Sequence, residues 1–397
     1  MAMMPIEDLK RRPQIAGWTP FALGFRPFFL SAGLYAVLMM ALWLLVLRGI
    51  ITPGELPSAV WHGHEMLFGF AVAVIAGFLL TAAQNWTGIP TPSGLPLAAL
   101  FGLWLAGRLS FLVPGLPPQL VAAIDLSFLP VLAATLARPI LKARQLNNYP
   151  FPFMLLALTA ANALVHGQAL GLSGTARLGL HLAAYVVVTM ITVMGGRVIP
   201  SFTDNKLRTR ARRWKSIERL VPVATVLALI AALVAPDSRI TALLAALAAA
   251  VHAIRLAGWY TPKFWSVPLL WILHLGYAWI VVGFALLALS ALGPGIVALS
   301  ALHAFTAGGI GVLTLGMMAR VSLGHTGRQL EPPRIMTLAF VAINLAVLIR
   351  VALPLLFPGM YAQILAAAGL VWIAAFGLFV WVYAPMLLRP RVDGKPG

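Results

Sequence analysis

The sequence contains no cysteine and few charged residues. Of its 397 residues, Cys counts 0 and only 10% are charged, whereas soluble domains average about 25%. A chain without thiols forms no disulfide, iron–sulfur cluster, thiolate copper site or covalently attached c-type haem. Any metal must therefore be held by histidine, methionine or oxygen ligands. The scarcity of charge, beside 61% hydrophobic residues, excludes an ordinary water-soluble domain.

Acidic residues are the scarcer charge, 10 against 28 lysines and arginines, so the formal net charge is +18. In a soluble protein such an excess would suggest a nucleic-acid partner. Here the basic residues lie in short clusters between apolar blocks, and the densest run, Lys206 to Arg219, falls in one loop. That distribution is typical of membrane topology. We therefore expect the lipid bilayer as a partner and no nucleic acid.

Long hydrophobic runs make up most of the chain. A membrane-spanning helix needs about 20 mainly apolar residues, and twelve such blocks are separated by Pro/Gly turns or by charge. The expected spans are 22–48, 61–86, 95–113, 118–141, 151–171, 177–200, 217–235, 239–257, 265–290, 295–321, 335–356 and 360–388. The sequence thus predicts an all-α polytopic membrane protein.

The basic residues also predict the orientation. With the N-terminus in the cytoplasm, alternate loops follow the positive-inside bias, so both termini are expected inside. The basic residues left at the outer face are Arg48, Arg108, Arg177, Arg239 and Arg350. We expect Arg108, Arg177 and Arg350 to reach toward the lipid headgroups; the alternative is that they pair with haem propionates.

The predicted organisation is one transmembrane domain with short polar ends. The N-terminal stretch has two acids and no small-residue cleavage site after an early apolar run, so it is not expected to be a cleavable signal peptide. The expected boundaries are 1–20 for a cytoplasmic N-terminal segment, 21–390 for a single twelve-helix transmembrane domain with a basic cytoplasmic loop at 201–216, and 391–397 for a cytoplasmic tail.

Spans two, six and ten resemble one another. Each runs from outside to inside, has a histidine near its outer end, and closes with small or polar residues; His64, His181 and His303 are those histidines. The recurrence every four helices predicts a three-fold pseudo-repeat of four spans. This layout resembles the haem–copper oxidase catalytic subunit, although repeats are also common in transporters.

Ionisable residues inside the predicted spans gather in the outer half of the bilayer. Burying a polar group in hydrocarbon costs several kcal/mol unless it is paired, so such residues are functional candidates. The candidates are His62, His64, His166, His181 and His303, with Glu65, Asp125 and Asn162 at the same depth. Neutral imidazole binds iron, copper and zinc, and a helix bundle can bring such ligands together. If the helices pack closely, this depth suits a metal or cofactor site.

The spacing of these residues limits how they can act. His62 and His64 are two positions apart, so on a regular helix they point about 200° apart and cannot ligate one metal. Glu65 falls on the face of His62, where it is expected to orient that imidazole, and Asp125 is expected to orient another histidine. Each lone histidine also has a plainer interpretation, as an interfacial or hydrogen-bonded residue. His252, near the inner surface, is expected to be interfacial.

Three stretches resemble the signatures of a known family: GFRPFF at Gly24 to Phe29, WHGHEMLFGF at Trp61 to Phe70, and GGRVIPSFT at Gly195 to Thr203. They are similar to the NnrS family of bacterial inner-membrane proteins, and the span profile agrees over nearly the whole chain. The resemblance implies a haem- and copper-containing protein that accompanies denitrification genes and protects cells against nitric oxide. His62 and His64 match the signature histidines, and His181 and His303 match those of spans six and ten. Which of them would hold iron and which copper stays open.

The residues restrict what that resemblance implies. Without cysteine, a haem would be non-covalent, most simply b-type, and a copper ion would need two or three of the same histidines. The leading hypothesis is a haem/copper protein that binds nitric oxide, or reduces it with quinol as donor, in the outer half of the membrane. The alternatives are a proton-coupled secondary transporter and a membrane metal or cofactor-assembly protein. Transporters usually place ionisable residues near the midplane, which disfavours the first alternative.

Overall fold

The computed structural model describes residues 17, 19–53, 56–293 and 296–395, and in these ranges it contains helices, turns and loops but no strand. Eleven helices are long and apolar enough to cross a membrane, and α4 (Leu95–Ser110) is a shorter apolar helix. Together they match the twelve predicted spans, most of them to within a few residues at each end. The chain is a multi-pass membrane protein.

The helices are conveniently described as three units of four spans. Unit one comprises α1 (Phe25–Leu47), the continuous span α2–η2–α3 (Ser58–His64, Glu65–Ala71, Val72–Thr87), α4, and α5 (Pro118–Lys142). Unit two comprises α6 (Pro150–Ala169), α7 (Ala176–Leu207), α8 (Lys215–Val234) and α9 (Arg239–Trp259). Unit three comprises α10 (Pro268–Ser290), the continuous span α11–η5–α12 (Ile296–His303, Ala304–Val312, Leu313–His325), α13 (Arg334–Leu356) and α14 (Tyr361–Leu388). The short 3-10 turns are η3 (Leu146–Asn148), η4 (Pro262–Ser266) and η6 (Pro358–Met360).

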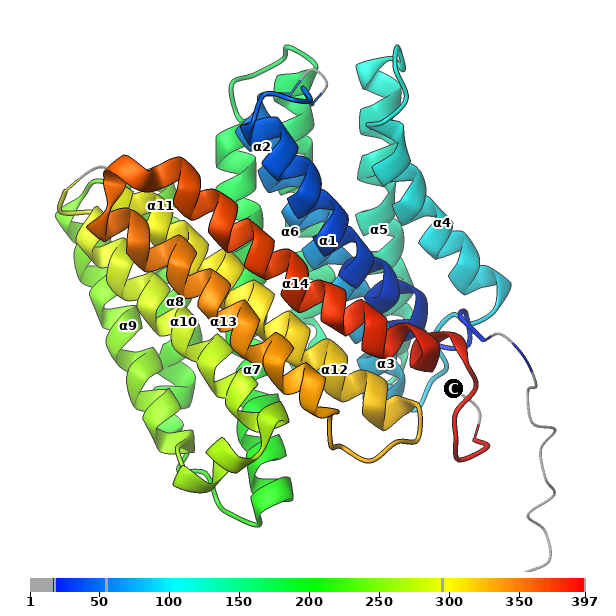
Figure 1. Cartoon of the computed structure of the whole chain (residues 1–397). Coiled ribbons are helices and arrows are strands. Elements are labelled where there is room, and N and C mark those ends of the chain that lie inside the picture. The colour runs from blue at the N-terminus through cyan, green and yellow to red at the C-terminus, as the bar shows by residue number, and fades with distance from the viewer. Residues whose placement is uncertain (1–16, 18, 54–55, 294–295, 396–397) are drawn as a thin grey trace, which may run out of the picture.

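The packing pattern repeats from unit to unit. In each unit the first span packs on the second and the third on the fourth. The fourth span then packs on the first span of the next unit, as α5 does on α6 and α9 on α10, and α14 returns to pack on α1. Figure 1 shows α14 running beside α1, which closes the bundle into a ring. These contacts support the predicted three-fold pseudo-repeat.

The second span of each unit lies toward the centre. The α2–η2–α3 span is the most buried, with 83% of its most apolar stretch inside the protein, against 28% for α1. It packs on α7, and α7 also packs on η5. Two of these central spans contain a π-helical stretch that begins directly after a histidine, η2 after His64 and η5 after His303. Such stretches change which way the following side chains face and often occur at functional sites.

The GFRPFF stretch explains how the ring closes. Arg26 donates hydrogen bonds to the carbonyls of Leu387 (3.0 Å) and Arg389 (2.6 Å), at the C-terminal end of α14. A cation is favourable there because the last carbonyls of a helix lack intrahelical partners. At Gly24 a side chain would meet Leu80 of α3 at 2.6 Å, so only glycine permits this close approach. The stretch therefore joins the first span to both the second and the last.

One predicted boundary is wrong. Helix α7 continues through Pro200 as far as Leu207, so the segment between α7 and α8 is 208–214 and not the whole of 201–216. Arg208 takes a left-handed conformation (φ 53°) that ends the helix, and the Asp204 carboxylate accepts a hydrogen bond from the Ala211 amide (2.7 Å). The apolar part of the sequence ends near Pro200, about two turns before helix α7 itself ends at Leu207.

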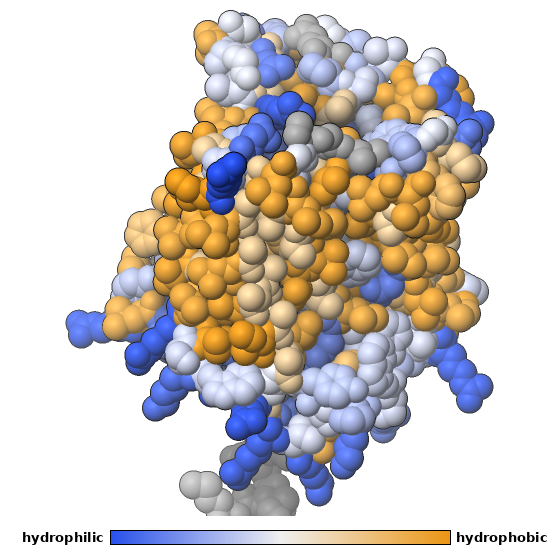
Figure 2. Space-filling model, turned by 90° about the vertical axis from the view of Figure 1, so that its left-hand side faces the viewer, coloured by the Kyte–Doolittle hydropathy of each residue, from blue (hydrophilic) through white to orange (hydrophobic). Residues whose placement is uncertain are grey.

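The surface agrees with a membrane location. Figure 2 shows a broad apolar band across one face of the molecule, with hydrophilic side chains above and below it. Many apolar side chains on the membrane-spanning helices are exposed, for example Ile230 at 53% and Leu345 at 46%, as expected for groups in contact with lipid. The positive-inside bias predicts that the end of the molecule with the basic segment 208–214 faces the cytoplasm.

Candidate metal centre

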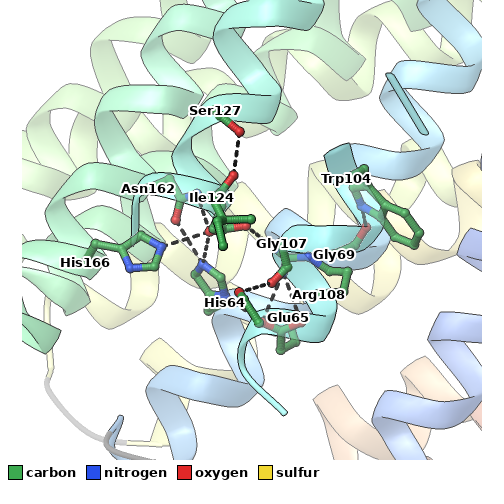
Figure 3. A network of polar contacts seen from close by, with 12 residues as sticks. His64, Glu65, Gly69, Trp104, Gly107, Arg108, Ile124, Ser127, Asn162 and His166 are labelled. Carbon is green, nitrogen blue, oxygen red and sulfur yellow. Dashed lines mark hydrogen bonds and ion pairs between the residues drawn. The ribbon is translucent and has the colours of Figure 1, made fainter. Parts of the chain in front are cut away.

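A buried polar network links the first five spans on the side of the membrane that carries the histidines. We call it the outer polar network, and Figure 3 shows most of its side chains converging between the helices. Its members are Tyr35 (α1), His64 (α2), Glu65 (η2), Arg108 (α4), Asp125 (α5), and Asn162 and His166 (α6). Residues far apart in the sequence thus meet at one depth, as the sequence predicts.

Arg108 bridges the two carboxylates of the network. Its Nη1 lies 3.0 Å from both oxygens of Glu65, and its Nη2 contacts Asp125. All three side chains are at most 4% exposed. Two buried carboxylates without a cation would cost many kcal/mol, so the arginine makes their burial tolerable. The expectation that Arg108 reaches to the headgroups is therefore wrong, because it points into the bundle.

His64 occupies the middle of the network. Its Nδ1 lies 2.8 Å from Glu65 Oε1, and its Nε2 lies 2.9 Å from Asn162 Oδ1 and 3.2 Å from Asp125 Oδ2. Both ring nitrogens therefore face oxygen acceptors. The expected partner of Glu65 was His62; the structure instead gives it His64, where the π-helical stretch begins.

Asp125 gathers the remaining donors. Its Oδ2 accepts from Asn162 Nδ2 (2.8 Å) and from His166 Nε2 (2.9 Å), so the aspartate orients a histidine, as expected. Ligand atoms of His64, Asp125 and His166 all lie within 4.8 Å of one another, the one such group of three among the described residues. Two imidazole nitrogens and one carboxylate oxygen form a donor set that suits copper, zinc or iron.

The surroundings hold this group tightly. At Gly107 a side chain would meet Asp125 Oδ1 at 2.9 Å, so α4 approaches α5 only because glycine stands there. Gly69 likewise leaves room for the Tyr35 ring, whose hydroxyl bonds Glu65. Phe111 covers the two imidazoles, 5.0 Å from His64 and 5.9 Å from His166 between ring centroids. The site is thus enclosed and shielded from water by packed side chains.

The other three candidate histidines lie apart from this group. His62 stacks on Trp43 with ring centroids 4.4 Å apart, and its buried Nδ1 meets no hydrogen-bond partner in the described structure. His181 and His303 donate their Nδ1 protons to the carbonyls of Arg177 and Leu299, both at 2.8 Å. That bond fixes the tautomer, so Nε2 of each ring keeps its lone pair for a metal. Of the five candidate histidines that the sequence predicts in one layer, the structure brings His64 and His166 together and gives the other three separate partners.

The family comparison agrees with these features. The family model described as NnrS protein matches residues 19–391. The chain belongs to the NnrS family. No curated protein matches it. The three signature stretches now have structural roles. GFRPFF closes the ring, and WHGHEMLFGF supplies His62, His64 and Glu65. GGRVIPSFT contains the two glycines against which a second polar network packs.

We call this second network the inner polar network; it was not predicted from the sequence. In this NnrS family member Gly195 and Gly196 of α7 leave room for the ring of Tyr277 and the guanidinium of Arg255. Arg255 pairs with Glu218 and donates to the Tyr277 hydroxyl (3.1 Å). His252 lies 2.8 Å from both Tyr277 Oη and Thr225 Oγ1, fully buried, so its expected interfacial position is wrong. The signal that could have found the network is the glycine pair, which marks close packing.

Arg108 and Tyr35 were also overlooked as members of the outer polar network. The signal that could have found Arg108 is the pair of acids, because Glu65 and Asp125 both lie inside predicted spans and each needs a cation nearby. Arg108 is one of the arginines near that depth, as is Arg350. The depth of a residue can be read from the sequence, but the direction in which it points cannot.

Proposed function

We propose that this protein holds redox-active metal in the outer half of a bacterial inner membrane and there binds nitric oxide or reduces it. The observation that carries the proposal is the buried group of His64, Asp125 and His166, whose ligand atoms lie within 4.8 Å of one another. Family membership supports the link to the nitric-oxide response. Since nitric oxide is small and apolar, it would reach such a site directly from the lipid.

Copper suits the group of His64, Asp125 and His166. Its donors are two imidazole nitrogens and a carboxylate oxygen, and Asp125 Oδ2 already lies 2.9 Å from His166 Nε2 and 3.2 Å from His64 Nε2. A metal would replace the protons that these nitrogens now share with the carboxylate. The chain has no cysteine, so a blue-copper site is excluded and an open imidazole site is the form that fits.

A non-covalent b-type haem suits the other histidines. Axial ligation requires a neutral imidazole with a free nitrogen, and His181 and His303 offer Nε2 while their Nδ1 protons are bound to backbone. His62 adds a buried nitrogen without a partner in the described structure. Haem would therefore be held at the outer ends of the central spans.

The residues of the chain contribute positioning and charge. When bound, the metals would supply a site where nitric oxide coordinates and receives electrons. Glu65 and Asp125 fix the orientation of His64 and His166, and Arg108 keeps the two carboxylates in place. Phe111 excludes water from the imidazoles. Turnover would need a reductant, and a membrane quinol is the class of donor that supplies both electrons and protons within the bilayer.

The test is metal analysis and optical spectroscopy of the detergent-purified protein, reduced and then exposed to nitric oxide. The variants are His166→Ala for the copper group and His303→Ala for the haem group. His252→Ala is the matched control, because His252, like His166, is buried in a span but belongs to the inner polar network. We expect His166→Ala to lose copper, His303→Ala to change the haem spectrum, and the control to keep both metals.

Size-exclusion chromatography of each variant separates loss of metal from loss of fold. A wild-type protein that is folded, colourless and free of metal after growth with haem and copper would overturn the proposal. The proton-coupled transporter would then become the better interpretation of the outer polar network.

A further inference from the structure

A cavity of about 120 Å³ lies between the three central spans. Its wall comes from the second span of every unit, with Leu273 of α10 and Phe151 of α6 completing it. The central spans line it from Ala71 to Leu79, from Val187 to Ile199 and from Ile310 to Met317. The cavity thus lies where the three pseudo-repeats meet.

The wall is almost wholly apolar, which limits what can occupy the space. Among the described residues Thr314 is the one wall residue with a polar side chain, and its hydroxyl already donates to the carbonyl of Gly311 (3.0 Å). A water molecule needs two to four polar partners, and apolar cavities near this size, about 150 Å³, stay dry and take up xenon or benzene. Water and ions are therefore excluded as occupants.

The volume limits the occupant further. Pockets for cofactors and drug-sized ligands occupy roughly 300–1,000 Å³, so a haem is too large for this cavity. No histidine belongs to the wall. Three methionines do, Met190, Met194 and Met317, and their flexible thioethers can adapt to a small guest. What remains is an uncharged, apolar molecule of a few atoms.

The position of the cavity relative to the histidines is the same in each unit. The first wall residue follows the histidine by about two helical turns, roughly 10 Å at 1.5 Å per residue. This holds for His64 and Ala71, for His181 and Val187, and for His303 and Ile310. The cavity therefore lies directly inward of the histidine layer along all three central spans.

We propose that this cavity binds a small apolar gas and stores it beneath the histidines. The binding itself follows from the volume and wall of the cavity. That the natural guest is nitric oxide rests on the proposed function. A gas that partitions into the bilayer would be concentrated in this space. Transfer of an apolar gas out of water is favourable in free energy, and the cavity provides dispersion contacts without displacing ordered water.

Xenon is the probe for the cavity, measured by 129Xe NMR with the detergent-purified protein. Ile191→Trp fills the space from α7, and Met317→Ala enlarges it from α12. Ile230→Trp is the matched control, because Ile230 is 53% exposed on α8 and faces lipid. We expect saturable xenon binding to the wild type, weakened by at least about tenfold in Ile191→Trp, strengthened in Met317→Ala and unchanged in Ile230→Trp.

A second measurement separates this proposal from the proposed function. The rate at which nitric oxide binds to the reduced protein should fall in Ile191→Trp, while the amount bound at saturation and the metal content stay as in the wild type. The cavity proposal would be overturned if the wild type showed no saturable xenon binding. It would also be overturned if a folded Ile191→Trp protein bound xenon as the wild type does. An acyl chain that occupies the space would give that result. Loss of metal, by contrast, would count against the proposed function alone.

Discussion

The outer and inner polar networks bury similar groups but balance their charge differently. In the outer polar network Glu65 and Asp125 share a single arginine, and all three side chains are at most 4% exposed. In the inner polar network one carboxylate meets one arginine, and the Glu218 side chain is 27% exposed. His64 faces acceptors on both sides, whereas His252 lies between two hydroxyls. The outer network has an excess of negative charge and can take a cation; the inner network is complete.

The hydrogen bonds of the inner network explain why it is complete. Arg255 donates to the Tyr277 hydroxyl, so this hydroxyl can donate to His252 Nδ1. His252 Nε2 then donates to Thr225, which itself donates to the carbonyl of Val221 (2.8 Å). Every donor has an acceptor, and a neutral histidine suffices. Such chains join helices in membranes, so this network serves packing, and the comparison can be tested by substitution.

The largest effect should come from removing the arginine of each network. Arg108→Met leaves Glu65 and Asp125 buried without a cation, which should lower the free energy of unfolding by about 3–5 kcal/mol. Arg255→Met should cost less, because the Glu218 carboxylate is partly exposed and can be hydrated. Denaturation followed by tryptophan fluorescence in detergent measures both. Equal losses of stability would mean that the two networks balance their charge in the same way.

A smaller effect should come from crowding the inner network. Gly196→Ala places a methyl group on the Arg255 guanidinium, and overpacking of this kind costs about 1–3 kcal/mol. Gly102→Ala on α4 meets no atom within 4 Å and is the matched control, expected to be neutral or slightly stabilising. The same denaturation assay compares them, and metal content should be unchanged in both. Loss of metal in a folded Gly196→Ala protein would show that the inner network also supports the metal centre.

Removing one hydroxyl tests the directed chain of hydrogen bonds. Tyr277→Phe leaves His252 Nδ1 and one Arg255 donor without their partner, which should cost about 1–3 kcal/mol. Tyr383→Phe is the control, because the Tyr383 hydroxyl is buried but makes no hydrogen bond within the described residues. Thermal unfolding midpoints distinguish the two variants. If Tyr383→Phe proves as destabilising as Tyr277→Phe, the chain is not what stabilises the inner network.

The smallest effect should come from an exposed ion pair. The hydrogen bond from Arg391 lowers the pKa of Asp393 to about 2. This pair therefore stabilises the fold above the unfolded carboxyl pKa of about 3.9, and the contribution is lost as the pH falls toward 2. Asp393→Asn should shift the unfolding midpoint at pH 7 less than Gly196→Ala does, since exposed pairs are screened by water. A larger shift would show that burial does not decide the strength of these pairs.

The spans could be predicted because crossing a bilayer is a matter of length and apolarity. All twelve lie close to their predicted positions, and the depth of the five candidate histidines followed from them. Their partners could not be predicted. The direction of a side chain depends on which helices pack together, and the π-helical stretches after His64 and His303 change that direction within a span. On a regular helix Glu65 would lie beside His62, but in the structure its carboxylate is hydrogen-bonded to His64.

The depth of Arg108 was predicted as well, but its role was not. An arginine near the outer end of a span can reach outward to lipid or inward to acids, and hydropathy is the same in both cases. The choice is decided by Gly107, which brings α4 against Asp125. Close helix packing is the property that one sequence reveals least, and both polar networks depend on it.

The bonds from Arg26 to the end of α14 have a consequence for how the chain is made. These partners are 361 residues apart for Leu387 and 363 for Arg389, so the first helix enters the membrane long before its last neighbour exists. At roughly 5–20 residues per second, synthesis delays that meeting by tens of seconds. During this time the guanidinium must be held by headgroups, water or the insertion machinery. The ring is therefore completed by its first helix and its last, and a chain that stops short leaves a charged, unfinished edge.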